Sequence, residues 1–119
     1  MPVESSELNR PLSEIKTELF KALAHPARIR ILELLADRPR PVGELLPLVG
    51  LESSHLSQQL GVLRRAGLVT SRKEGSSSIY AIRDPELVEL LAAAKRVLIN
   101  SLSSTRDLLE DLRAAVDGS

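Results

Sequence analysis

Four residues suited to nucleic-acid contacts recur at helical spacing in the middle of the chain. They are Ser54, Gln58, Gly61 and Arg65, which are spaced by four, three and four positions. On a helix they share one face, and hydroxyl, amide and guanidinium groups are the ones that contact base edges and phosphates in a DNA groove. The opposite face is apolar and carries Leu56, Leu60 and Leu63. The polar face also suits an ordinary helix exposed to solvent. The flanking elements therefore decide between a DNA-binding helix and a solvated surface helix.

The segment before this helix completes a helix-turn-helix. Residues 42–49 predict a short helix, which Gly50 closes as a C-cap. Ser53 is the expected N-cap of the next helix, because its hydroxyl can accept a backbone N–H. A short helix, a tight turn and a second helix with a polar outer face predict a helix-turn-helix over about 42–66.

The segment after it reads as a β-hairpin. Gly67 ends the helix, and strands are expected at 68–72 and 78–82, with a turn at 73–77 between them. The hairpin predicts a wing over about 68–83, directly behind the helix-turn-helix.

Two more helices are expected nearer the N-terminus, over 12–23 and 27–36. The His25–Pro26 pair separates them, since proline fits the first helical turn and His25 is then a junction residue. Residues 37–41 contain two prolines, which exclude a continuous helix. We expect this connector to form a short edge strand beside the wing.

The last predicted helix is unusually long. Asp84, Pro85 and Glu86 form a strong helix start, and the helical pattern continues over about 85–116. Residues 100–105 are poor helix formers, which leaves a kink or restart near Ser104 open. A chain of 13.0 kDa does not need so long an apolar helix by itself, so we expect it to form a dimer. The predicted dimer interface contains Ile15, Leu19, Leu91, Ala94, Leu98 and Leu109.

The composition bounds the fold class. With 119 residues, 43% of them hydrophobic but only 2% aromatic, the chain is long enough for one aliphatic core. This favours packed helices over a β-sandwich. We predict a mobile tail over 1–10 and a single, mainly α domain over 11–119.

The net charge of zero hides an uneven distribution. Residues 1–20 carry two basic and four acidic groups, residues 21–83 ten and five, and residues 84–119 four and seven. The successive sums of −2, +5 and −3 place a basic region around the predicted DNA-reading elements.

Several classes of protein are not expected. The chain has no cysteine, which excludes disulfides and thiolate metal sites within it. It has no 18-residue apolar run and no signal-peptide pattern, so no membrane partner is expected and the prediction is a cytoplasmic protein. It has no nucleophile-elbow, P-loop or metal-hydrolase signature, so no enzyme is predicted.

Two segments in this order carry a family resemblance. LAHPARIRILELL at 23–35 and SQQLGVLRRAGLV at 57–69 resemble the ArsR/SmtB winged-helix repressors, and the similarity covers roughly residues 12–99. It implies the winged helix-turn-helix order α-α-α-α-β-β-α and a homodimer on an inverted-repeat operator. It also implies repression that an inducer, often a metal ion, relieves.

The family's metal sites do not carry over. The helix before the predicted recognition helix, where many members hold a cysteine motif, reads VGELL at 42–46. The last helix offers Asp84, Glu86 and Glu89 without a histidine, and carboxylates alone do not suit zinc or nickel. We therefore expect no metal site and no cofactor. Any effector is an unidentified small molecule or protein.

The prediction is a regulator whose partners are double-stranded DNA and a second copy of the chain. The residues expected at the DNA are Ser54, His55, Ser57, Gln58, Arg64, Arg65, Arg72 and Lys73. Arg64 and Arg65 sit at the helix end and suit phosphates, while Arg72 and Lys73 lie at the wing. The alternative is a protein-interaction module that keeps the fold and uses the last helix without binding specific DNA.

Overall fold

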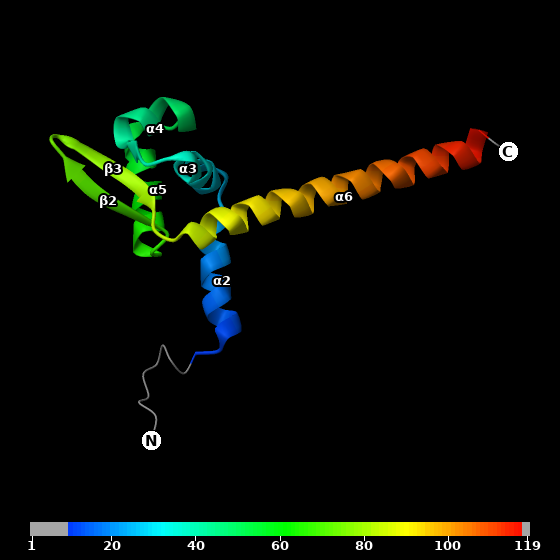
Figure 1. The fold of residues 1–119 in the computed structure, drawn as a ribbon, viewed down its shortest axis with the longest axis horizontal. Helices are drawn as coiled ribbons and strands as arrows, with labels where there is room; N and C mark the ends of the chain where they lie inside the picture. Colours follow the sequence, from blue (N-terminus) through cyan, green and yellow to red (C-terminus); the bar gives the residue numbers. More distant parts are fainter. Residues whose placement is uncertain (1–9, 118–119) are drawn as a thin grey trace, which may run out of the picture. The chain divides into compact units, whose positions relative to one another are not determined.

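The computed structural model describes residues 10–117 of the chain (Figure 1). Its contacts divide the chain into two compact units, one ending at Asp84 and the other beginning at Pro85. The elements are α2 (Leu12–Leu23), α3 (Pro26–Asp37), β1 (Arg40–Pro41), α4 (Val42–Val49), α5 (Ser53–Arg65), β2 (Val69–Glu74), β3 (Ser77–Ile82) and α6 (Pro85–Asp117). The tail expected over 1–10 lies outside the described residues except for Arg10. No helix in residues 10–117 is long and apolar enough to span a membrane.

The core of the first unit is aliphatic, as the composition predicts. The fully buried large side chains are Ile31, Leu32, Leu45, Leu56, Leu60, Leu63 and Val69. They come from α3, α4, α5 and β2, because α3 contacts α4, α5 and β3 while α5 contacts β2. This core fixes the recognition helix against both the preceding helices and the wing.

The α2–α3 junction confirms the role of His25. His25 is the N-cap of α3, and its Nδ1 accepts a hydrogen bond from the backbone N–H of Ala27 at 3.1 Å. Pro26 takes the first helical position, where its missing N–H costs nothing. The imidazole of His25 therefore stabilises the start of α3.

The wing is a three-stranded antiparallel sheet in the order β1-β3-β2. The expected edge strand is confirmed, with Arg40 opposite Tyr80 and Pro41 opposite Ile79. The expected five-residue turn at 73–77 is wrong, because β2 continues to Glu74, which pairs with Ser77. Gly75 has a φ of 64°, and such a left-handed residue lets two residues reverse the chain in step with the twist of the strands.

The turn between α4 and α5 confirms one expected cap and corrects another. Gly50 is the left-handed C-cap of α4, and its N–H donates to the Leu46 carbonyl at 3.1 Å. Ser53 is not the N-cap of α5 but its first helical residue, and Glu52 is the cap, without a side-chain hydrogen bond. The extended backbone of Glu52 starts the helix through its carbonyl, which accepts from the Leu56 N–H at 2.9 Å.

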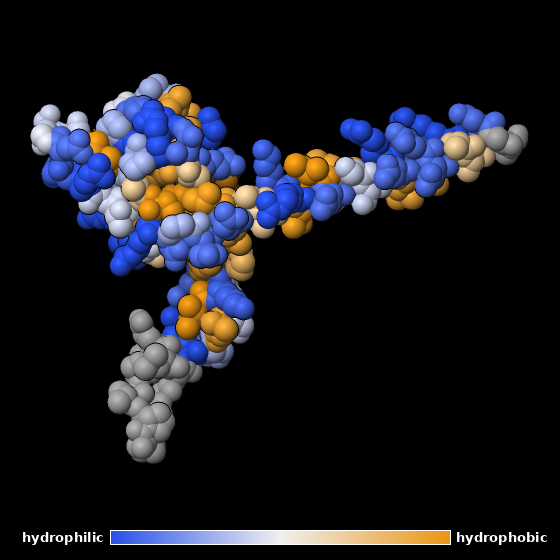
Figure 2. All heavy atoms as spheres, viewed as in Figure 1, coloured by the Kyte–Doolittle hydropathy of each residue, from blue (hydrophilic) through white to orange (hydrophobic). Residues whose placement is uncertain are grey.

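Helix α6 runs without interruption for 33 residues, including 100–105. The hydroxyl of Thr105 donates to the Ser101 carbonyl at 3.0 Å, so this polar group is satisfied inside the helix instead of competing with it. Figure 2 shows apolar side chains at intervals along α6. The large ones that are exposed in this helix are Val97, Leu98, Ile99, Leu102, Leu108, Leu109, Leu112 and Val116.

Candidate nucleic-acid interface

The two faces of α5 differ as the sequence predicts. Its apolar face is almost fully buried, since Leu56, Leu60 and Leu63 are at most 1% exposed. The other candidates on this helix are exposed, and they are Ser54, His55, Ser57, Gln58, Arg64 and Arg65. The core thus holds α5 by one side and leaves a row of hydroxyl, imidazole, amide and guanidinium groups on the outside.

Gly61 makes room on this outer face for an arginine from the same helix. A Cβ added at Gly61 would lie 3.1 Å from the Nη1 atom of Arg65. The guanidinium of Arg65 therefore folds back over the glycine one turn earlier. Because the neighbour is the flexible end of a side chain, it can extend toward a phosphate or base without any movement of the backbone.

The other basic candidates differ in what they contact. Arg64 donates from Nη1 to the Ser71 Oγ at 3.0 Å, which ties the end of α5 to β2. Arg72 forms an ion pair with Glu74 at 3.1 Å, with both side chains largely exposed. Lys73 is exposed beside them, and no acidic side chain in residues 10–117 pairs with it. Within the described residues, Lys73 is therefore a wing cation without an acidic partner.

A contact behind α5 involves two residues that the sequence does not place in the site. Arg28 of α3 donates from Nη1 to the Gln59 Oε1 at 2.9 Å, and the same guanidinium contacts the end of α2. No signal in the sequence pairs them, because 31 positions separate them.

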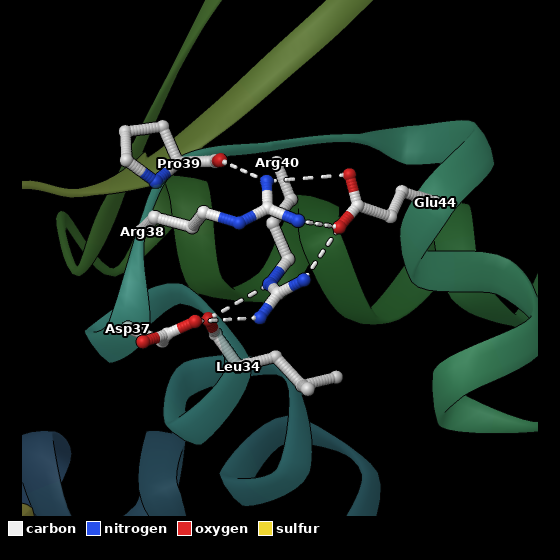
Figure 3. A network of polar contacts seen from close by, with 6 residues as sticks. All are labelled: Leu34, Asp37, Arg38, Pro39, Arg40 and Glu44. Atoms are coloured by element: carbon white, nitrogen blue, oxygen red, sulfur yellow. Dashed lines mark hydrogen bonds and ion pairs between the residues drawn. The ribbon is translucent and has the colours of Figure 1, made fainter.

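A buried arginine holds α4, the first helix of the helix-turn-helix (Figure 3). Arg40 is 9% exposed and donates from Nε to the Leu34 carbonyl at 3.0 Å. Its two terminal nitrogens reach Asp37 at 3.0 Å and Glu44 at 2.5 Å. One side chain thus joins the end of α3, the strand β1 and the first turn of α4.

Glu44 receives a second arginine in the same network. Arg38 also pairs with its carboxylate (Figure 3). The hydrogen bond from Arg38 lowers the pKa of Glu44 below its ordinary value, Arg40 contributes in the same direction, and burial opposes them. The carboxylate is therefore ionised at neutral pH and neutralises charge close to the basic surface.

The expected dimer residues are apolar and largely uncovered in the single chain. Ile15 is 42% exposed in α2, and Leu98 and Leu109 are 64% and 48% exposed in α6. Ala94 is exposed, and Leu19 and Leu91 are half-buried. Over residues 10–117, no group of three or more His, Asp or Glu side chains is placed to hold a metal ion.

Comparison with known proteins identifies the family. Residues 25–71, from the N-cap of α3 to the start of the wing, match the family model described as bacterial regulatory protein, arsR family. The HTH-type transcriptional regulator Rv0081 of Mycobacterium tuberculosis H37Rv is 62% identical over 107 residues, which are 89% of this chain and 94% of that protein. The chain belongs to the ArsR family.

Other relatives of this ArsR-family regulator agree with the assignment. The biofilm growth-associated repressor of Agrobacterium fabrum is 38% identical over 96 residues, covering 77% of this chain and 82% of that protein. The crystal structure of Rv0081 superposes with a TM-score of 0.76 at 61% identity, over 82% of this chain and 98% of that one. The protein is thus a transcriptional regulator with a winged helix-turn-helix DNA-binding fold, and not an enzyme.

A solution structure adds the quaternary state of one relative. The winged helix-turn-helix domain of Mb0332 from Mycobacterium bovis is described as homodimeric and as a possible ArsR-family regulator. It is 30% identical with a TM-score of 0.73, over 87% of this chain and 95% of that one.

Proposed function

We propose that this protein is a homodimeric repressor that binds an inverted-repeat operator with one recognition helix α5 per half-site. The observation that carries the proposal is the exposed polar face of α5, which stands opposite its buried leucines and next to a basic wing. Two such helices related by a two-fold axis meet successive major grooves about 34–36 Å apart.

Different residues have different roles at the DNA. Gln58 reads a base edge, because a glutamine amide pairs in two places with adenine, and Ser54, His55 and Ser57 flank it. Arg65 contacts a base or phosphate after it extends from Gly61. Arg64 stays on β2 and contacts phosphate with its remaining donors. Arg72 and Lys73 approach the backbone or the adjacent minor groove from the wing.

The dimer forms through the apolar faces of α2 and α6. Exposed leucines along a helix of a soluble chain are expected to be covered by a partner. The residues proposed to contact the partner are Ile15 and Leu19 in α2, and Leu91, Ala94, Leu98 and Leu109 in α6. The homodimeric state of Mb0332 supports the same assembly here.

Regulation occurs without the family's cysteine or histidine metal sites. The sequence has no cysteine, and its two histidines lie on different elements, one of them as the cap of α3. Any effector that releases the operator is then a small molecule or a partner protein, and no cofactor takes part.

The test is fluorescence anisotropy with DNA from upstream of the gene for this protein, against scrambled DNA, at about 0.15 M salt. The wild type is expected to prefer the upstream fragment equally in EDTA and in added zinc. Gln58→Ala is expected to weaken specific binding by about 1–3 kcal/mol and leave unfolding unchanged. Arg65→Ala is compared with Arg96→Ala, which removes an exposed arginine from α6 instead.

Three results would count against parts of the proposal. Equal losses in Arg65→Ala and Arg96→Ala would reduce the role of α5 to general charge. Release by zinc would mean that a metal site exists. Absence of selective binding on this fragment and on a wider promoter library would favour the protein-interaction alternative.

A further inference from the structure

One guanidinium joins the end of α2 to the recognition helix. Arg28 donates from Nε to the Ala22 carbonyl at 2.6 Å and from Nη2 to the Lys21 carbonyl at 3.1 Å. Its Nη1 donates to the Gln59 Oε1 at 2.9 Å. Both side chains are half-buried. The three acceptors come from two helices, and α3 supplies the donor.

The α2 side of this contact holds Arg28 in one place. The last carbonyls of a helix have no donor within the helix, and a cation there also meets the negative end of the helix dipole. The backbone amides of Ala24 and His25 satisfy the carbonyls of Lys21 and Leu23. Arg28 supplies the donor for the Ala22 carbonyl and a second one for Lys21, so its guanidinium is held at this end of α2.

The α5 side of the contact adds a directional restraint on the rotation of α5. The buried leucines of α5 turn its apolar face toward the core, and the contact with Arg28 acts on the smaller rotations that this packing still permits. A hydrogen bond is directional, and Gln59 lies at the border of the apolar face. Gln58 is the next residue, one step of about 100° around the helix. Any rotation that stretches the Arg28–Gln59 bond therefore moves Gln58 relative to the DNA.

We propose that Arg28 and Gln59 are a positioning pair for operator recognition. Together with the buried leucines, they restrain the rotation of α5 relative to the end of α2 and so keep Gln58 in its reading position, without contacting DNA themselves. The inference rests on the proposed function of α5. Helix α2 also carries Ile15 and Leu19 of the proposed dimer interface. The pair therefore joins one of the proposed dimerisation helices, α2, to the recognition helix α5.

Gln59→Met tests the pair in the full-length protein. Methionine keeps the length of the unbranched side chain and removes the acceptor, while Arg28 retains both carbonyls of α2. We expect an operator affinity about tenfold lower, with the thermal midpoint, the dimer and the salt dependence as in the wild type. An unchanged salt slope separates this loss from that of a phosphate contact.

A double-mutant cycle separates positioning from an independent effect. If Gln59 acts through Gln58, then Gln58→Ala loses less affinity in the Gln59→Met background than in the wild type. On α3, Arg30→Met is the control for charge, and it is expected to leave the Gln58→Ala effect intact.

Two outcomes would overturn the inference while the proposed function stands. They are a wild-type operator affinity in Gln59→Met and strictly additive losses in the cycle. A wild type that does not prefer any DNA sequence would overturn the proposed function itself, and with it the positioning role.

Discussion

Leu98 offers a direct test of the proposed dimer, since 64% of its surface is exposed in the single chain. Complete burial of a leucine side chain stabilises by roughly 1.5–3 kcal/mol, so covering the exposed part contributes about 1–2 kcal/mol per protomer. A symmetric dimer contains two copies, which makes about 2–4 kcal/mol. Leu98→Ala removes most of this contribution and is expected to raise the dimer dissociation constant about 30- to 700-fold.

Sedimentation velocity over a dilution series measures this constant directly. Leu48→Ala is the matched control, because Leu48 is also an exposed leucine, 43% uncovered, on helix α4 outside the proposed interface. Circular dichroism and thermal unfolding at a concentration where both proteins are dimeric check that α6 remains helical. Operator affinity is expected to fall with the dimer in Leu98→Ala and to remain unchanged in Leu48→Ala.

A dissociation constant for Leu98→Ala within threefold of the wild type, or an equal shift in Leu48→Ala, would refute the reasoning. The first result would mean that no second copy covers this face of α6. The second would mean that loss of any exposed leucine weakens the dimer through a general effect on the fold.

Three further predictions concern the arginine network and the wing. Arg40→Met is expected to lower the free energy of unfolding, measured in urea, by about 1–3 kcal/mol. The reason is that the buried carbonyl of Leu34 loses its hydrogen-bond donor. An unchanged free energy of unfolding would show that water replaces the guanidinium. Glu44→Gln is expected to be less stable than the wild type at pH 7. This difference should shrink as the pH falls below the ordinary carboxyl pKa of 4.5, and disappear once the pH is below the lowered pKa of folded Glu44. The sign follows from the lowered pKa of folded Glu44, since its stabilising effect is present above the unfolded pKa and is lost as the carboxylate takes up a proton; a difference that stays constant throughout acidification would exclude this cause. Lys73→Ala is expected to lower the salt slope of operator binding by about one without changing sequence preference, and a changed preference in anisotropy measurements would assign Lys73 to base reading.

Local patterns in the sequence were sufficient to predict the order of elements. Apolar spacing predicted the helices and the buried side of α5, because a helix in a single-core protein must turn its apolar stripe inward. Gly50 and the His25–Pro26 pair placed helix ends correctly, since left-handed backbone and a missing N–H restrict where those residues fit. The same patterns led to the family, whose two sequence segments lie on α3 and on α5 with the start of β2.

Local patterns were less reliable where two conformations cost nearly the same. Ser53 is a good N-cap by type, yet α5 begins at Ser53 itself and Glu52 takes the cap position. The hairpin turn uses two residues instead of five, because strand pairing continues as far as Gly75 permits. Helix α6 passes through 100–105, where the Thr105 hydroxyl bonds to the carbonyl of Ser101. Residues of these types cost only about 0.7 kcal/mol or less each in a helix, so they do not interrupt it.

The sequence by itself determined which residue types the recognition helix presents and which side of it is buried. Only the tertiary structure decided how these groups are held: Arg65 folded over Gly61, Arg64 on β2, Arg40 beneath α4, and Arg28 between α2 and Gln59. The physical reason is that periodicity follows from the chain's own geometry, one residue after the next. A long arginine, in contrast, reaches whichever acceptor folding brings near it, and that acceptor can be many positions away.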